Sequence, residues 1–160
     1  MTVLVLGIGN DWRSDDAAGL EVARRLDAAA IRAMAWEGDP SGLIDAWARE
    51  PAVILVDAVC SGAVGGTVHR LDASTGALPA RLFRGSTHHV SVADAVELGR
   101  CLGRLPARVE FIGIEGRRFE AGVGLTPEVA RAVDDVAAEL RRRLAPPRED
   151  RRMRQGRGAA

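Results

Sequence analysis

The sequence lacks lysine and tyrosine entirely, since all 22 of its basic side chains are arginines. This absence excludes a phosphate-binding loop that ends in lysine, a Schiff-base lysine and a tyrosine acid. Neither G-x-S-x-G nor H-E-x-x-H occurs anywhere in the chain. Serine-hydrolase and zincin mechanisms therefore have no support.

An excess of one charge and a long apolar run are also missing. The 22 basic side chains are matched by 22 acidic ones, so nothing draws the whole chain toward nucleic acid or an anionic membrane. No apolar run reaches the roughly 18 residues of a membrane span, and the amino terminus leads directly into a strand. Cys60 and Cys101 form no C-x-x-C pattern, which favours two idle thiols in a reducing compartment. We expect a cytoplasmic protein that binds neither nucleic acid nor membrane.

Apolar strand patterns alternate with helical patterns along the chain. Strands are predicted at residues 3–6, 31–36, 52–56, 67–71 and 108–114, and helices at 14–30, 41–47, from Ser91 and from Thr126. This alternation predicts a three-layer α/β/α sandwich around a mainly parallel, twisted sheet of about five strands. Residues 1–145 are expected to form a single domain, and the arginine-rich residues 146–160 a disordered basic tail.

The first strand leads through a glycine turn, residues 7–10, into an acidic loop. Asp11, Asp15 and Asp16 would repel a phosphate, and Trp12 stands where a dinucleotide-binding fingerprint needs its third glycine. An acidic loop at a strand end suits a cation or a positively charged substrate. The glycines are expected to let the metal or peptide of a partner approach the backbone closely.

A purely structural interpretation of the same loop stays open. Ser14 is a candidate N-cap for the first helix, and Asp15 and Asp16 would favour the positive end of that helix. Both interpretations hold together if only one of the two aspartates points into a pocket. We assign Asp16 to the pocket and Asp15 mainly to the helix start.

Three candidate residues follow or precede elements that should meet at one edge of the sheet. Asp16 follows the first strand, Asp57 follows the buried strand at 52–56, and His88 precedes the third long helix. Two carboxylates and an imidazole suit a borderline divalent ion such as nickel, zinc, iron or manganese. Alternatively, Asp57 fixes a turn and His88 caps the helix, with His89 as the ligand.

Two further residues have simpler interpretations. His69 lies in an alternating strand and is predicted to be a surface histidine. Cys60, three residues after Asp57, is interpreted as a small buried thiol rather than a nucleophile paired with His88.

Four sequence blocks together resemble a known family. They are Leu4-Val-Leu-Gly-Ile-Gly-Asn10 with Asp15-Asp16 and Gly19, then Val56-Asp57-Ala58, then Ser86-Thr87-His88 followed by Ala93-Asp94, and Gly113-Ile114-Glu115. In this order, over residues 3 to 144, the chain resembles the [NiFe]-hydrogenase maturation endopeptidases, which remove a C-terminal extension from the hydrogenase large subunit. The resemblance implies an aspartic-type endopeptidase whose partner is the large-subunit precursor.

The resemblance also implies roles for individual residues. Asp16, Asp57 and His88 would bind the nickel already inserted in the precursor and form the catalytic site, whereas Glu37 and Asn10 would contact the substrate. The enzyme would hold no permanent cofactor, because the precursor supplies the nickel, and we expect it to act as a monomer. Two alternatives remain: a non-catalytic nickel-dependent chaperone or docking module for hydrogenase assembly, and a flavodoxin-like nucleotide-binding module.

Overall fold

The structure, a computed structural model, describes residues 2–85 and 89–146. Its sheet has five strands: β1 (Val3–Ile8), β2 (Ala33–Trp36), β3 (Ala52–Val59), β4 (Val68–Asp72) and β5 (Arg108–Glu115). The strand order is β2-β1-β3-β5-β4, with β4 antiparallel to β5 and every other pair parallel. The predicted mainly parallel sheet of five strands is confirmed.

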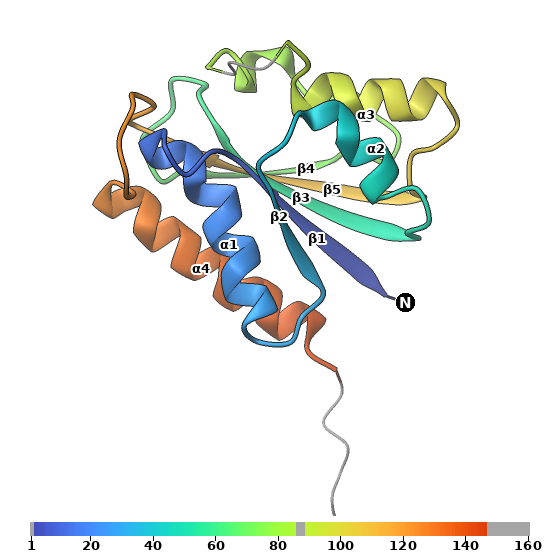
Figure 1. The fold of residues 1–160 in the computed structure, drawn as a ribbon, viewed down its shortest axis with the longest axis horizontal. Helices are drawn as coiled ribbons and strands as arrows, with labels where there is room; N and C mark the ends of the chain where they lie inside the picture. The colour runs from blue at the N-terminus through green and yellow to red at the C-terminus, as the bar shows by residue number, and fades with distance from the viewer. Residues whose placement is uncertain (1, 86–88, 147–160) are drawn as a thin grey trace, which may run out of the picture.

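Helices cover both faces of this sheet (Figure 1). They are α1 (Ala18–Asp27), α2 (Leu43–Ala46), α3 (Val92–Cys101) and α4 (Pro127–Leu144), with short 3₁₀ turns η1 (Ser14–Ala17), η2 (Pro40–Gly42) and η3 (Ala80–Leu82). Helices α1 and α4 lie on one face, and α2 and α3 lie on the other. The three-layer sandwich predicted from the sequence is therefore confirmed.

The central strand β3 shows how the sheet directs side chains to its two faces. Leu55 and Val59 belong to the apolar core beneath α2 and α3, whereas Ile54 and Val56 belong to the core beneath α1 and α4. Successive side chains of a strand point to opposite faces. Asp57 therefore lies on the same face as Leu55 and Val59, at the end of the α2–α3 core.

Several element boundaries differ from the sequence prediction by a few residues, and two of them bear on the site. Strand β3 does not end at Asp57 but continues to Val59, because β5 also extends and pairs with it as far as Glu115. The first helix ends at Asp27 instead of residue 30, and Ala30 adopts a left-handed backbone with φ +58°. Asp57 is consequently held in a hydrogen-bonded ladder, which fixes its backbone more firmly than a loop would.

Glycines allow α1 to lie very close to the sheet. A Cβ atom on Gly7 would lie 1.9 Å from the carbonyl oxygen of Gly19, and one on Gly9 would lie 2.0 Å from the carbonyl oxygen of Asp16. Both distances are far below van der Waals contact. The close approach that these glycines permit is thus made by the chain's own helical segment, which corrects the expectation that a partner makes it.

Several predictions lie outside the described residues. His88 is one of them, and nearly all of the expected disordered tail is another. Within residues 2–85 and 89–146, no helix is both long and apolar enough to cross a membrane.

Candidate active site

A small cavity opens beyond the carboxyl ends of β1 and β3. Side chains from η1, β3, η3 and the following loops line it, including those of Asp16, Asp57, Cys60, Leu82, Phe83 and Phe119. Its volume is about 30 Å³, enough for one or two water molecules or a single ion. Asp16 and Asp57, which are 41 positions apart in the sequence, thus face one space of ionic size.

The carboxyl group of Asp57 has a strongly perturbed acidity. Burial raises its pKa well above the ordinary value, and the negative charge of Asp16 raises it further. The backbone N–H of Ala58 acts in the opposite direction, but its effect is smaller. A low-dielectric setting and a second carboxylate both disfavour the ionised form. A cation placed between Asp16 and Asp57 would reverse this preference.

The loop after β1 folds back on itself and so brings Asp16 over the end of that strand. The backbone N–H of Asp16 donates to the carbonyl oxygen of Arg13 at 3.1 Å, and the N–H of Asn10 donates to the carbonyl oxygen of Asp16 at 3.4 Å. Asp16 itself is half-buried. The turn therefore fixes the backbone that carries this carboxylate.

Asp15 has a different role from its neighbour. Its fully buried carboxylate accepts hydrogen bonds from the backbone N–H groups of Arg117 (2.8 Å), Arg118 (2.9 Å) and Thr126 (2.7 Å). The hydroxyl of Thr126 donates to it as well, at 2.9 Å. Asp15 thus joins the loop after β1 to the segment between β5 and α4. Its assignment mainly to the helix start is corrected accordingly.

Ser14 belongs to the same junction. Its hydroxyl donates to the carbonyl oxygen of Glu120 at 3.0 Å and forms no capping hydrogen bond with the helix. Ser14 also has a positive φ of 52°, so the chain turns sharply before η1 begins. The N-cap expected at Ser14 is therefore wrong, because this side chain reaches across to the segment before α4.

A second buried carboxylate, Glu115, fixes the loop after β3. It accepts hydrogen bonds from the backbone N–H groups of Ser61 (2.7 Å) and Gly62 (3.1 Å) and from the hydroxyl of Ser61 (2.8 Å). The Nε2 atom of His69 lies 3.2 Å from the same carboxylate. His69 is therefore partly buried and paired, which corrects its prediction as a surface histidine.

Sequence reasoning did not assign these two roles. Glu115 could have been found, because it ends a buried apolar strand as Asp57 nearly does, and an acid in that place needs a partner. Asp15 carries no comparable local signal. Its hydrogen-bond donors lie more than 100 residues further along the chain.

Glu37 and Asn10 do not line the cavity. Glu37 is exposed, lies 3.7 Å from Arg24, and has a pKa raised by the nearby carboxyl group of Asp11. Asp11 itself forms a closer ion pair with Arg24, at 2.6 Å. The side-chain oxygen of Asn10 accepts the backbone N–H of Trp12 at 2.9 Å. Asn10 directly follows Gly9 and Glu37 stands three residues before Pro40, and both Gly9 and Pro40 line the cavity.

The predicted imidazole ligand cannot be placed, because His88 lies outside the described residues. His89 is exposed and stands two residues before Ser91, which caps α3 in a capping box with Asp94. Within residues 2–85 and 89–146, no group of three or more His, Cys, Asp or Glu side chains is arranged to hold a metal ion. The described part of the site supplies two carboxylates.

Comparison with known proteins identifies the family. The sequence model described as hydrogenase maturation protease matches residues 39–142. The chain belongs to this family. The hydrogenase 2 maturation protease of Escherichia coli K12 is 30% identical over 152 residues, covering 88% of this chain and 92% of that protein. The hydrogenase expression/formation protein HupD of Rhodobacter capsulatus is 30% identical over 150 residues, covering 89% and 70%. The predicted peptidase is confirmed.

Solved structures of maturation proteases share the fold. The [NiFe] hydrogenase maturation protease HybD from Thermococcus kodakarensis superposes with a TM-score of 0.71 at 27% identity, covering 91% of this chain and all of that one. An endopeptidase from Escherichia coli superposes with a TM-score of 0.69 at 27% identity, covering 89% and 94%. The nucleotide-binding alternative gains no support from any of these relatives.

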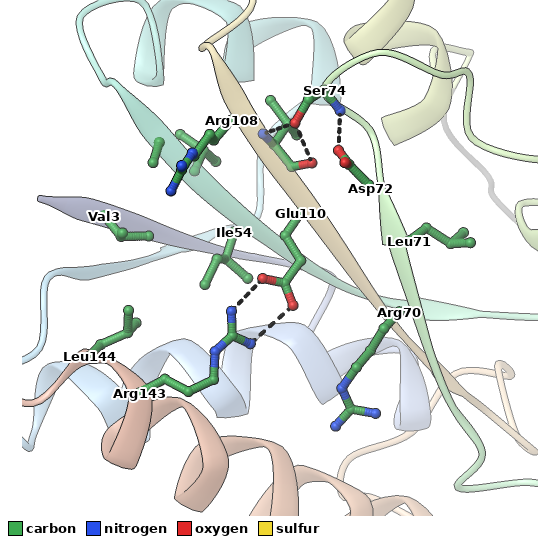
Figure 2. A pocket seen from close by; sticks show the side chains of 13 residues that line it. Val3, Ile54, Arg70, Leu71, Asp72, Ser74, Arg108, Glu110, Arg143 and Leu144 are labelled. Carbon is green, nitrogen blue, oxygen red and sulfur yellow. Dashed lines mark hydrogen bonds and ion pairs between the residues drawn. The ribbon is translucent and has the colours of Figure 1, made fainter. Parts of the chain in front are cut away.

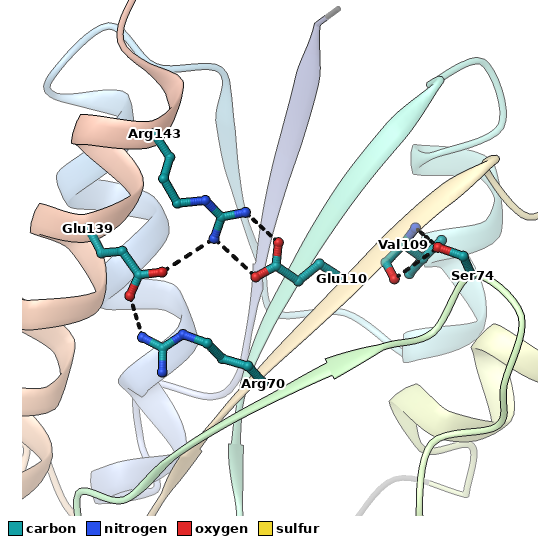
Figure 3. Close-up of polar contacts among 6 residues, drawn as sticks. All are labelled: Arg70, Ser74, Val109, Glu110, Glu139 and Arg143. Atoms are coloured by element: carbon teal, nitrogen blue, oxygen red, sulfur yellow. Dashed lines mark hydrogen bonds and ion pairs between the residues drawn. The ribbon is translucent and has the colours of Figure 1, made fainter.

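This maturation protease also has a larger cavity of about 480 Å³, which lies at the other end of the sheet, where β1, β3 and β5 begin (Figure 2). Three of its charged side chains, Arg70, Glu110 and Arg143, take part in ion pairs. Arg143 binds Glu110 through two hydrogen bonds of 2.6 and 3.0 Å, and Glu139 links Arg143 to Arg70 (Figure 3). These pairs join α4 to β4 and β5. Because parallel sheets bind ligands beyond the carboxyl ends of their strands, the smaller cavity remains the candidate active site.

Proposed function

We propose that this protease removes the C-terminal extension of a [NiFe]-hydrogenase large-subunit precursor after nickel has been inserted. The observation that carries the proposal is the cavity of about 30 Å³ that Asp16 and Asp57 share. Family membership supplies the peptidase activity, and the paired carboxylates supply a reason for the protease to recognise a metal-loaded substrate. The nickel of the precursor is the part of the substrate that these carboxylates bind.

Asp16 and Asp57 are the two oxygen ligands in this proposal, and His88 supplies a nitrogen ligand. Nickel accepts such a mixed set of carboxylate and imidazole ligands. The repulsion that raises the pKa of Asp57 disappears when a divalent cation lies between the carboxylates. Binding of the nickel centre therefore replaces the repulsion between the two carboxylates by the attraction of each carboxylate to the cation.

Two routes lead from this docking to hydrolysis of the peptide bond. The nickel of the substrate polarises the scissile carbonyl as a Lewis acid, or a carboxylate removes a proton from the attacking water. Asp16 and Asp57 are both candidates for the second role, because both face the cavity in which the nickel centre docks. Glu37 and Asn10 contact the substrate beside the cavity. The protease acts in the cytoplasm as a monomer and holds no metal of its own at rest.

The decisive experiment incubates the protein with the nickel-loaded large-subunit precursor and follows the mass of the precursor. We expect a single loss of mass from its C-terminus with the wild type, and none with Asp16→Asn or His88→Ala. Asp45→Asn is the matched control, because Asp45 is 82% exposed on α2 and pairs with Arg104. Full cleavage by Asp16→Asn would contradict the proposed site, whereas binding without cleavage by the wild type would indicate a nickel-dependent chaperone.

A further inference from the structure

Exposed apolar side chains gather around the loops that surround the cavity. In the described part of the chain, Trp12 is 73% exposed, Val123 is 78% exposed and Val64 is 80% exposed. They lie on the loops that follow β1, β5 and β3, at one end of the sheet (Figure 1). Single exposed apolar side chains are ordinary, whereas neighbouring ones that form a patch mark a binding surface, so what matters is which of the three lie on adjoining segments.

Trp12 and Val123 lie on adjoining backbone segments. The backbone N–H of Gly122 donates to the carbonyl oxygen of Trp12 at 2.9 Å, and Val123 follows directly. The next residue, Arg13, forms a parallel bridge with Gly122. We call these two exposed side chains the Trp12–Val123 patch. The patch is therefore formed by two loops, after β1 and after β5, that are far apart in the sequence.

The loops that carry the patch also reach the candidate cavity. The guanidinium Nε of Arg13 donates to the carbonyl oxygen of Phe119 at 3.1 Å, and Phe119 lines the cavity. A protein whose nickel centre reaches Asp16 must therefore also cover the surface beside it. This position beside the cavity favours the substrate protein as the occupant of the patch.

The two loops are held firmly although they contain little regular structure. The buried carboxylate of Asp15 accepts three backbone N–H groups from the segment that carries Val123. The hydroxyl of Ser14 adds a fourth link between the same two segments. A patch fixed in advance loses little conformational entropy when a partner binds.

The three tryptophans of the chain differ in how they are used. Trp47 is fully buried and its indole N–H donates to the carbonyl oxygen of Arg104. The indole of Trp36 donates to the carbonyl oxygen of Asp39. Trp12 instead presents most of its surface to solvent. Tryptophan is enriched among the few residues that dominate binding energy at interfaces.

We propose that the Trp12–Val123 patch is the docking surface for the large-subunit precursor, an apolar area of that protein beside its nickel site. The inference rests on the proposed function and adds the surface that binds the substrate outside the cavity. The patch acts in recognition only, so it changes affinity for the precursor and leaves the chemical step alone.

The test compares Trp12→Ala, Val123→Ser and the double variant with the wild type. For each protein, the Kd for the nickel-loaded precursor is measured by surface plasmon resonance, and KM and kcat are measured from precursor cleavage. Trp12→Ala should raise Kd and KM at least about tenfold and keep kcat within about twofold of wild type. Trp12→Phe should recover most of the affinity, because it retains a large aromatic surface.

Leu102→Ala is the matched control, since Leu102 is 56% exposed but follows α3 on the side where β5 begins. It should leave both Kd and KM unchanged. Wild-type affinity in the double variant, or an equal loss of affinity in Leu102→Ala, would overturn the docking surface. Precursor binding without cleavage by the wild type would overturn the proposed function alone, and failure of the wild type to bind the precursor would overturn both.

Discussion

The adjacent aspartates 15 and 16 should respond in opposite ways to the same substitution. Asp15→Asn replaces a buried carboxylate that accepts hydrogen bonds from Arg117, Arg118 and Thr126. An amide has only one oxygen that accepts hydrogen bonds. Its NH₂ group donates, so it cannot pair with the N–H groups that face the second carboxylate oxygen of Asp15. Asp16→Asn changes a half-buried carboxylate at the cavity and leaves this junction intact.

The size of the Asp15 effect follows from these contacts. If the amide oxygen faces Arg117 and Arg118, the amide NH₂ faces the N–H of Thr126, and one buried donor is left unsatisfied at about 1–3 kcal/mol. The two remaining hydrogen bonds lose the negative charge that strengthens them, which weakens each by roughly half. We expect Asp15→Asn to lower the free energy of unfolding by about 3 kcal/mol in total.

For a chain of this length, a loss of about 3 kcal/mol lowers Tm by about 6–12 °C. Thermal unfolding followed by circular dichroism at pH 7 measures this shift, and precursor cleavage is assayed with the same samples well below Tm. Asp15→Asn should unfold early and retain cleavage in proportion to its folded fraction. Asp16→Asn should keep the wild-type Tm within about 2 °C and lose cleavage.

Two results would refute this reasoning. A Tm of Asp15→Asn within 2 °C of wild type would show that the buried hydrogen bonds do not hold the junction together. A loss of stability in Asp16→Asn as large as that in Asp15→Asn would show that both aspartates are structural. The comparison therefore tests the division of roles within one dipeptide.

Three further predictions concern other parts of the fold. Asp57→Asn should raise Tm by a few degrees at pH 7 and leave it unchanged at pH 3.5. The pKa of Asp57 is raised in the folded state, so at any pH above its unfolded-state pKa the ionised group destabilises the fold, by about 1.4 kcal/mol for each pH unit of the shift. A lower Tm of the variant at pH 7 would contradict this. Gly7→Ala should destabilise by at least about 3 kcal/mol, measured by urea unfolding, because its Cβ would meet the carbonyl oxygen of Gly19. Glu139→Gln should lower stability by about 1 kcal/mol or less at pH 7. Since Arg70 lowers the pKa of Glu139, this difference should vanish as the pH falls through that pKa, and urea unfolding at pH 7 and pH 3 checks it.

The central strands were predictable because their side chains are apolar on both faces of the sheet. Strands β1, β3 and β5 appear in the sequence as short runs of Val, Ile and Leu, which a buried parallel sheet requires. The antiparallel direction of β4 was not predictable from its residues. It depends on the short connection from β3, which Glu115 fixes through Ser61 and Gly62, and on pairing with a strand 40 residues further along.

The candidate site was predictable only in part. Asp57 interrupts an apolar strand, so its chemistry stands out in the sequence. The direction of its pKa shift could not be deduced from the sequence, since it depends on the burial of Asp57 in the fold and on the charge of Asp16 beside it. The patch around Trp12 was equally hidden, because the segment that carries Val123 reaches it only through contacts made in the folded chain.

Hydrogen bonding separates the structural acids of this protein from those of the proposed site. Asp15 and Glu115 are fully buried, yet each accepts several hydrogen bonds from backbone and hydroxyl groups, so the fold itself supplies their partners. Asp57 is held differently, because burial and the charge of Asp16 outweigh the N–H of Ala58 and raise its pKa. In the proposed function a cation removes this imbalance, and only a substrate that carries nickel brings one. A precursor without nickel would then leave the two carboxylates repelling each other, which links cleavage to completed metal insertion.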